Sequence, residues 1–121
     1  MPDTRSRLRK SISRWANQDR AEALDLQADT VRAGLVAIAE APDRELVTLQ
    51  GTLRTVTLRP RGGVPALEAE LYDGSGSLVV LWLGRRRIAG IHPGRAIRVT
   101  GRIGRHGEDR VLYNPHYELR Y

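Results

Sequence analysis

The sequence predicts an all-β main domain preceded by a helical segment. Apolar residues first recur at helical spacing, and from residue 46 they alternate with polar residues, as in half-buried strands. The charge changes at the same place: residues 19–45 hold three bases and seven acids, whereas residues 46–121 hold twelve bases and six acids. We therefore divide the chain into an N-terminal helical extension, residues 1–45, and a barrel-forming domain, residues 46–121.

The composition favours a small cytoplasmic protein with a polyanionic partner. The chain has 121 residues, 40% of them hydrophobic, which is enough for one compact domain with an appendage. It contains no cysteine, no apolar run long enough to span a membrane and no apolar signal core, so we expect a cytoplasmic location. The net charge is +6, and 19 of the 20 basic residues are arginine, which suits bidentate binding of phosphate.

The N-terminal extension predicts one or two helices. Residues 4–17 and residues 19–33 each show helical spacing of apolar side chains, with a candidate N-cap between them. On the first stretch, Leu8, Ile12 and Trp15 form an apolar stripe among five basic residues. A basic amphipathic helix of this kind can lie on nucleic acid, on an anionic membrane surface or on a protein partner.

Five alternating runs, separated by turn residues, predict five strands. The apolar phase of the first run slips by one residue between Leu53 and Val56, which indicates a bulge. The last run contains Pro115, which belongs at a sheet edge or a strand break. The predicted strands cover residues 46–58, 67–72, 77–84, 97–103 and 110–121.

The third predicted strand is unusual because LVVLWLG, residues 78–84, is apolar on both of its faces. Closing the sheet into a barrel buries one set of these side chains and directs Val79, Leu81 and Leu83 outward. We expect the N-terminal helices, from this chain or from a second copy, to cover part of that outer face.

Five strands in this order, with a long and bulged first strand, are typical of the OB-fold, a five-stranded Greek-key barrel. The segments GTLRTVTLRP, LEAELYDGSGSLVVLWLG, IHPGRAIRVTGRIG and VLYNPHYEL resemble the OB domain of the RecG helicase wedge. They also resemble small standalone actinobacterial proteins described as OB-fold nucleic-acid-binding domains. The matching elements are Gly51, the DGSG turn at residues 73–76, Pro93-Gly94 and the NPHY run at residues 114–117. The resemblance implies nucleic-acid binding. The 121 residues contain no phosphate-binding helicase motif and are too few for a helicase motor domain.

Two loops carry the candidate nucleic-acid contacts. Arg59 and Arg61 lie in the loop after the first strand, and Arg105 and Arg110 flank the loop before the fifth. These loops form the two sides of the usual OB cleft, where arginines can reach phosphates. Three further candidates lie on strands: one arginine that can follow a nucleic-acid backbone and two tyrosines that can stack on bases. The predicted nucleic-acid-binding residues are Arg54, Arg59, Arg61, Tyr72, Arg105, Arg110 and Tyr113.

One feature opposes this interpretation. Glu68 and Glu70 face outward on the second strand, in the middle of the expected groove, where they repel phosphates unless neighbouring arginines pair with them.

The sequence therefore predicts a non-enzymatic nucleic-acid-binding module without metal or cofactor. Single-stranded or branched DNA is the favoured partner, RNA remains open, and DNA repair or recombination is the expected setting. The three histidines are scattered, so they predict no metal site. The alternative is a protein-interaction or assembly module that uses the outer face of residues 77–84 or the N-terminal helices, with a partner or with a second copy.

Overall fold

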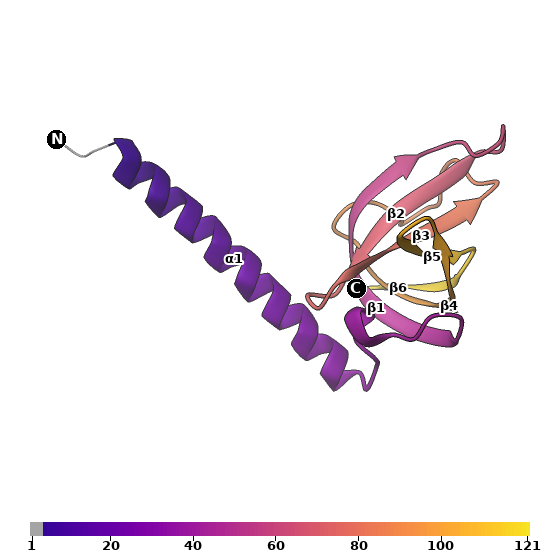
Figure 1. Cartoon of the computed structure of the whole chain (residues 1–121), viewed down its shortest axis with the longest axis horizontal. Helices are drawn as coiled ribbons and strands as arrows, with labels where there is room; N and C mark the ends of the chain where they lie inside the picture. Colours follow the sequence, from indigo (N-terminus) through magenta and orange to yellow (C-terminus); the bar gives the residue numbers. More distant parts are fainter. Residues whose placement is uncertain (1–3) are drawn as a thin grey trace.

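The structure, a computed structural model, describes residues 4–121 and the side chains from residue 12 onward. It consists of one long helix and a β-domain (Figure 1). The helix, α1 (Thr4–Arg32), is continuous through the position where a second helix was expected to start. No glycine or proline interrupts residues 4–32, so nothing local ends the first helical stretch. The Leu8 side chain of the predicted stripe lies outside the described side chains.

Six strands form the β-domain, and five of them close into a ring. β1 pairs with both β2 and β4, so the order β1-β2-β3-β5-β4 returns to its start. β6 pairs with the first half of β4, on the edge opposite to β1. Only the β3–β5 pairing is parallel. This closed ring agrees with the predicted fold. The strands are β1 (Leu46–Leu58), β2 (Ala66–Tyr72), β3 (Ser77–Leu83), β4 (Ala96–His106), β5 (Asp109–Tyr113) and β6 (His116–Arg120).

The predicted bulge in the first strand is confirmed. Leu53 pairs with Leu71 and Val56 pairs with Ala69, so β1 advances by three residues while β2 advances by two. The extra residue bends β1. Its first half can then pair with β4 and its second half with β2, which closes the barrel.

The predicted fifth strand is split in two at Asn114 and Pro115, in agreement with the expected proline break. Asn114 has a φ of 48°, its N–H donates to the carbonyl of Leu81 at 2.7 Å, and its Oδ1 accepts from the Leu83 N–H at 2.8 Å. After this corner the chain leaves β3 and continues as β6 along β4.

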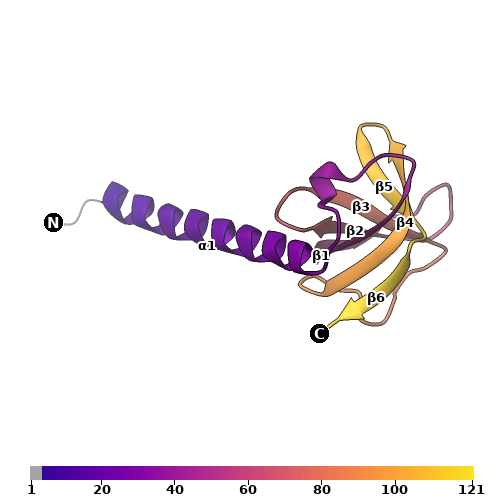
Figure 2. The same cartoon turned by 90° about the horizontal axis from the view of Figure 1, so that it is seen from below.

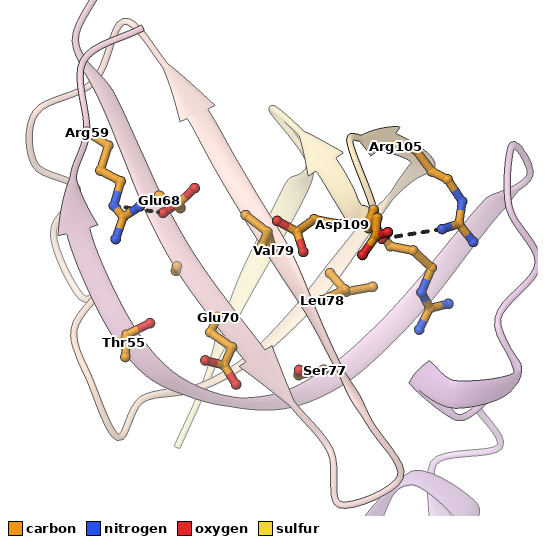
Figure 3. A pocket seen from close by; sticks show the side chains of 12 residues that line it. Thr55, Arg59, Glu68, Glu70, Ser77, Leu78, Val79, Arg105 and Asp109 are labelled. Atoms are coloured by element: carbon orange, nitrogen blue, oxygen red, sulfur yellow. Dashed lines mark hydrogen bonds and ion pairs between the residues drawn. The ribbon is translucent and has the colours of Figure 1, made fainter.

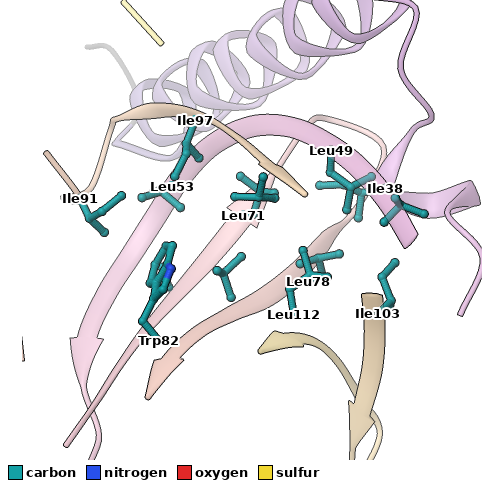
Figure 4. Close-up of a cluster of buried hydrophobic side chains, with 14 of the residues drawn as sticks. Ile38, Leu49, Leu53, Leu71, Leu78, Trp82, Ile91, Ile97, Ile103 and Leu112 are labelled. Carbon is teal, nitrogen blue, oxygen red and sulfur yellow. The ribbon is translucent and has the colours of Figure 1, made fainter. Parts of the chain in front are cut away.

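The barrel interior is apolar along its whole length (Figure 4). Trp82 and Tyr117 make an edge-to-face contact with ring centroids 5.7 Å apart. Ile38 lies toward one end of the row of core side chains, and Ile91 lies toward the other. The fully buried side chains from the strands include Leu49, Leu53, Leu71, Val80, Ile97, Val99, Ile103 and Leu112.

Ile38 comes from the segment between the helix and the barrel, residues 35–41, which we call the plug segment. Asp73 is buried in the β2–β3 turn, and its Oδ2 accepts a 2.8 Å hydrogen bond from the Ile38 N–H. Arg110 donates to the carbonyls of Ile38 and Ala41 at 2.8 and 3.2 Å. The plug segment is therefore tied to the barrel from two sides.

α1 does not cover the outer face of β3, contrary to the expectation from the sequence. Figures 1 and 2 show that it projects well beyond the barrel, with only its C-terminal part alongside. That part packs on β1 and on the β2–β3 turn, where Gln27 Nε2 donates to the Gly74 carbonyl at 2.7 Å. Leu81, on the outer face of β3, is instead buried with Ala66 and Val111 of the neighbouring strands.

The exposed part of α1 is amphipathic but strongly polar. Ile12 and Trp15 are 61% and 75% exposed. Within residues 4–121, no helix combines the length and the apolar character that crossing a membrane requires.

Candidate nucleic-acid interface

A groove of about 510 Å³ lies where the sequence places the OB cleft. β1, β2 and β3 form its floor and one side, and the β4–β5 hairpin forms the other side. Figure 3 shows Arg59 and Glu68 on one side, Val79 between, and Asp109 and Arg105 on the other. Three of the predicted binding residues, Arg59, Arg105 and Arg110, line this groove together.

The loop after β1 does not present free arginines to the groove. Arg59 Nε lies 3.2 Å from Glu68 Oε2, and an Arg61 terminal nitrogen lies 3.0 Å from Glu68 Oε1. Glu68 is the better shielded partner, with 18% of its side chain exposed. The predicted alternative, a pairing of the strand carboxylates with neighbouring arginines, is therefore found for Glu68 but not for Glu70.

The arginines on the opposite side of the groove are also engaged. The Arg105 guanidinium binds Asp43 at 2.8 Å. Arg110 donates to two carbonyls of the plug segment, so it stabilises the closed end of the barrel. Both partners lie more than sixty positions away in the sequence, and for this reason local patterns could not reveal these contacts.

The remaining predicted residues lie outside the groove lining. Arg54 and Tyr72 lie together, with the guanidinium carbon 3.4 Å from the ring centroid, which is a cation–π contact. This face of Tyr72 is occupied, so stacking on a base there requires Arg54 to move. Tyr113 is 43% exposed on β5, next to Leu81 in the β3–β5 register.

The groove is not basic. Its lining includes four carboxylates, on Glu68, Glu70, Glu108 and Asp109, against the three arginines. Within the described side chains, Glu70 and Asp109 make no ion pair. A phosphate chain entering this groove would meet carboxylates that the loop arginines do not neutralise.

Sequence reasoning overlooked a second set of arginines, on the outer face of β4 and β6. Arg98, Thr100 and Arg102 alternate with the buried Ile97, Val99 and Ile103 and with Gly101 along β4. This period-2 pattern was readable from the sequence and marks side chains that point away from the core.

The described residues contain no group of three or more histidine, aspartate or glutamate side chains that could hold a metal ion.

No family model matches the chain, and the curated proteins contain no match either. Solved structures do resemble it. The p204 HINb domain has a TM-score of 0.59 and 13% identity, covering 75% of this chain and 49% of that chain. RecG bound to a three-way DNA junction has a TM-score of 0.52 and 20% identity, covering 64% of this chain and 11% of that one.

A third similar structure is a Replication Protein A heterotrimer bound to ssDNA, with a TM-score of 0.51 and 16% identity. It covers 72% of this chain and 66% of that chain. Identities this low establish the fold alone. The shared fold supports the OB-fold prediction.

Proposed function

We propose that this chain is a non-enzymatic nucleic-acid-binding OB-fold module of the cytoplasm. One observation carries the proposal: a closed five-stranded barrel that holds a charge of +6 within residues 46–121. Two similar structures support it, since one is bound to a three-way DNA junction and the other to ssDNA. Single-stranded or branched DNA is the proposed partner, with RNA as the competing polymer and repair or recombination as the setting.

The mechanism is electrostatic. Arginine side chains neutralise phosphates and release counterions, which makes the affinity fall steeply with salt. Base stacking contributes little, because the aromatic side chains are few and Tyr72 is covered by Arg54. We therefore propose modest affinity with little sequence preference, and no cofactor.

A second candidate function is protein interaction or assembly. The observation that favours it is the groove, whose lining contains four carboxylates and the apolar Val79 and is better suited to a basic peptide than to nucleic acid. The exposed Ile12 and Trp15 on α1 offer a further surface for a partner or a second copy.

Fluorescence anisotropy with labelled single-stranded DNA, duplex DNA, branched DNA and RNA, at salt from about 50 to 200 mM, tests the proposed function. We expect dissociation constants of about 1–100 µM that rise steeply with salt, with single-stranded or branched DNA bound most tightly. Absence of binding to all four polymers at the lowest salt would contradict the proposal and favour the protein-interaction candidate.

A further inference from the structure

We infer that the phosphate-contacting surface of this module is the outer face of β1, β4 and β6, not the groove across β2 and β3. The inference rests on the proposed nucleic-acid-binding function and assigns it a site. We call this surface the arginine face and define it by Arg98, Arg102 and Arg120 with their polar neighbours.

Strand register places these side chains together. Across the three strands, Gln50 lies beside Arg98 and Arg98 beside Glu118, while Ala96 lies beside Arg120. Directly paired residues of neighbouring strands project to the same side of a sheet. Ile97, Val99 and Ile103, on the opposite side of β4, are fully buried, so the arginines project away from the core.

The arginines of this face make no ion pair within the described side chains, whereas Arg59 and Arg105 of the groove each pair with a carboxylate. Arg98 donates from Nε and from a terminal nitrogen to Gln50 Oε1, at 3.1 and 2.6 Å. This neutral partner orients the guanidinium without cancelling its charge. Arg102 donates to a backbone carbonyl, that of Arg44, at 2.6 Å. Arg120 is exposed and makes no ion pair within the described side chains.

A hollow of about 430 Å³ lies against this face, where the end of α1 meets the sheet. Its lining contains Arg32, Arg98 and Arg120 against one acidic side chain, that of Asp29, which already pairs with Arg32. The groove has the opposite balance, with four carboxylates and three arginines. Glu118 is the acidic side chain beside Arg98, and it lowers the positive charge of the face without reversing it.

The chemistry of the face fits phosphate better than protein. Its other outward side chains on β1 and β4 are mainly polar, with Thr48 and Thr100 hydrogen-bonded to each other at 3.0 Å. The exposed Leu46 lies at its end, beside Arg102. Hydroxyl and guanidinium groups are common donors to nucleic-acid phosphates. The buried centre of a protein interface is more apolar than this polar surface and is depleted of charge.

The test compares the full chain with three double variants, each of which removes two positive charges. R98A/R120A changes the arginine face, R59A/R105A changes the groove, and R85A/R86A changes an exposed loop as the matched control.

Binding is measured by fluorescence anisotropy with the same four polymers over the same range of salt concentrations. We expect R98A/R120A to weaken binding about tenfold or more. The slope of log K against log salt should also fall, by about 1.4 on single strands. The other two variants should have smaller effects on both quantities.

Two single variants keep the test valid if R98A/R120A unfolds. Arg120 is exposed, so R120E should fold, and we expect it to weaken binding several-fold more than R86E, its control with the same charge change.

The outcomes separate the inference from the proposed function. If the unmodified chain binds none of the polymers at low salt, the proposed function fails and the inference fails with it. If the chain binds but R59A/R105A loses binding while R98A/R120A keeps it, only the inference is overturned. Equal losses of affinity in all three variants would also overturn the inference, because the nucleic acid would then respond to the overall positive charge and not to one surface.

Discussion

A protein that starts at residue 43 will unfold at a much lower temperature than one that starts at residue 34. The shorter protein lacks the plug segment, which contributes the fully buried Ile38 to the core and receives hydrogen bonds from Arg110. Loss of a buried isoleucine side chain alone costs about 2–5 kcal/mol. In a domain of this size each kcal/mol lowers the melting temperature by about 4–8 °C. We therefore expect a difference of about 8–40 °C.

The longer protein lacks only α1, whose residues are mostly exposed, so it should melt close to the full chain. Thermal unfolding followed by circular dichroism measures all three proteins. Ile38→Ala in the full chain is the point-substitution counterpart and should reproduce a large part of the loss. Equal melting temperatures for the two truncated proteins would show that the plug segment does not stabilise the barrel.

Asp73→Ala will lower the free energy of unfolding by about 3 kcal/mol, because it removes several charge-assisted hydrogen bonds at a buried position. Asp73 is 1% exposed, and its carboxylate accepts from the backbone N–H groups of Ile38, Ser75 and Gly76 and from the Ser75 hydroxyl. Without the carboxylate, the buried Ile38 N–H loses its partner. The cost of leaving it unsatisfied adds to the lost bonds.

Urea unfolding measures this effect. Asp73→Asn keeps one acceptor oxygen and should lose less stability than Asp73→Ala. Asp25 is exposed on α1, so Asp25→Ala is the matched control and should leave stability unchanged. An Asp73→Ala protein within 1 kcal/mol of the unmodified chain would mean that this carboxylate does not hold the plug segment.

Local patterns in the sequence were sufficient for most of the barrel. Alternation located the strands, the phase slip between Leu53 and Val56 located the bulge, and Pro115 located the break between β5 and β6. Each of these features depends on neighbouring residues, because side-chain alternation, strand bending and the missing proline N–H are properties of a short stretch of chain.

The parts that the sequence did not reveal depend on distant residues. Arg105 and Arg110 could be placed beside their loop, but their partners could not be predicted, since Asp43 and Arg105 are 62 positions apart and Ile38 and Arg110 are 72 apart. The role of the plug segment was hidden for the same reason. Residues 35–41 contain little helical or strand pattern, and their packing is decided by the barrel end that they fill.

These long-range contacts determine which arginines are available to bind phosphate. The loop arginines predicted to bind phosphate are largely occupied by Glu68, Asp43 and the plug segment. Arg98 and Arg102 are hydrogen-bonded to neutral groups, and Arg120 makes no ion pair within the described side chains. The net charge of +6 therefore favours binding of a polyanion at the arginine face over binding in the groove.

The most direct test of the account is a nuclear magnetic resonance titration of the ¹⁵N-labelled full chain with a short single-stranded oligonucleotide at low salt. The account predicts amide shift changes concentrated in residues 48–52, 96–102 and 116–120, the strands of the arginine face. Changes confined to residues 66–72, 77–83 and 105–110 would place the nucleic acid in the groove and contradict the assigned site. A spectrum that does not change at all would contradict nucleic-acid binding itself.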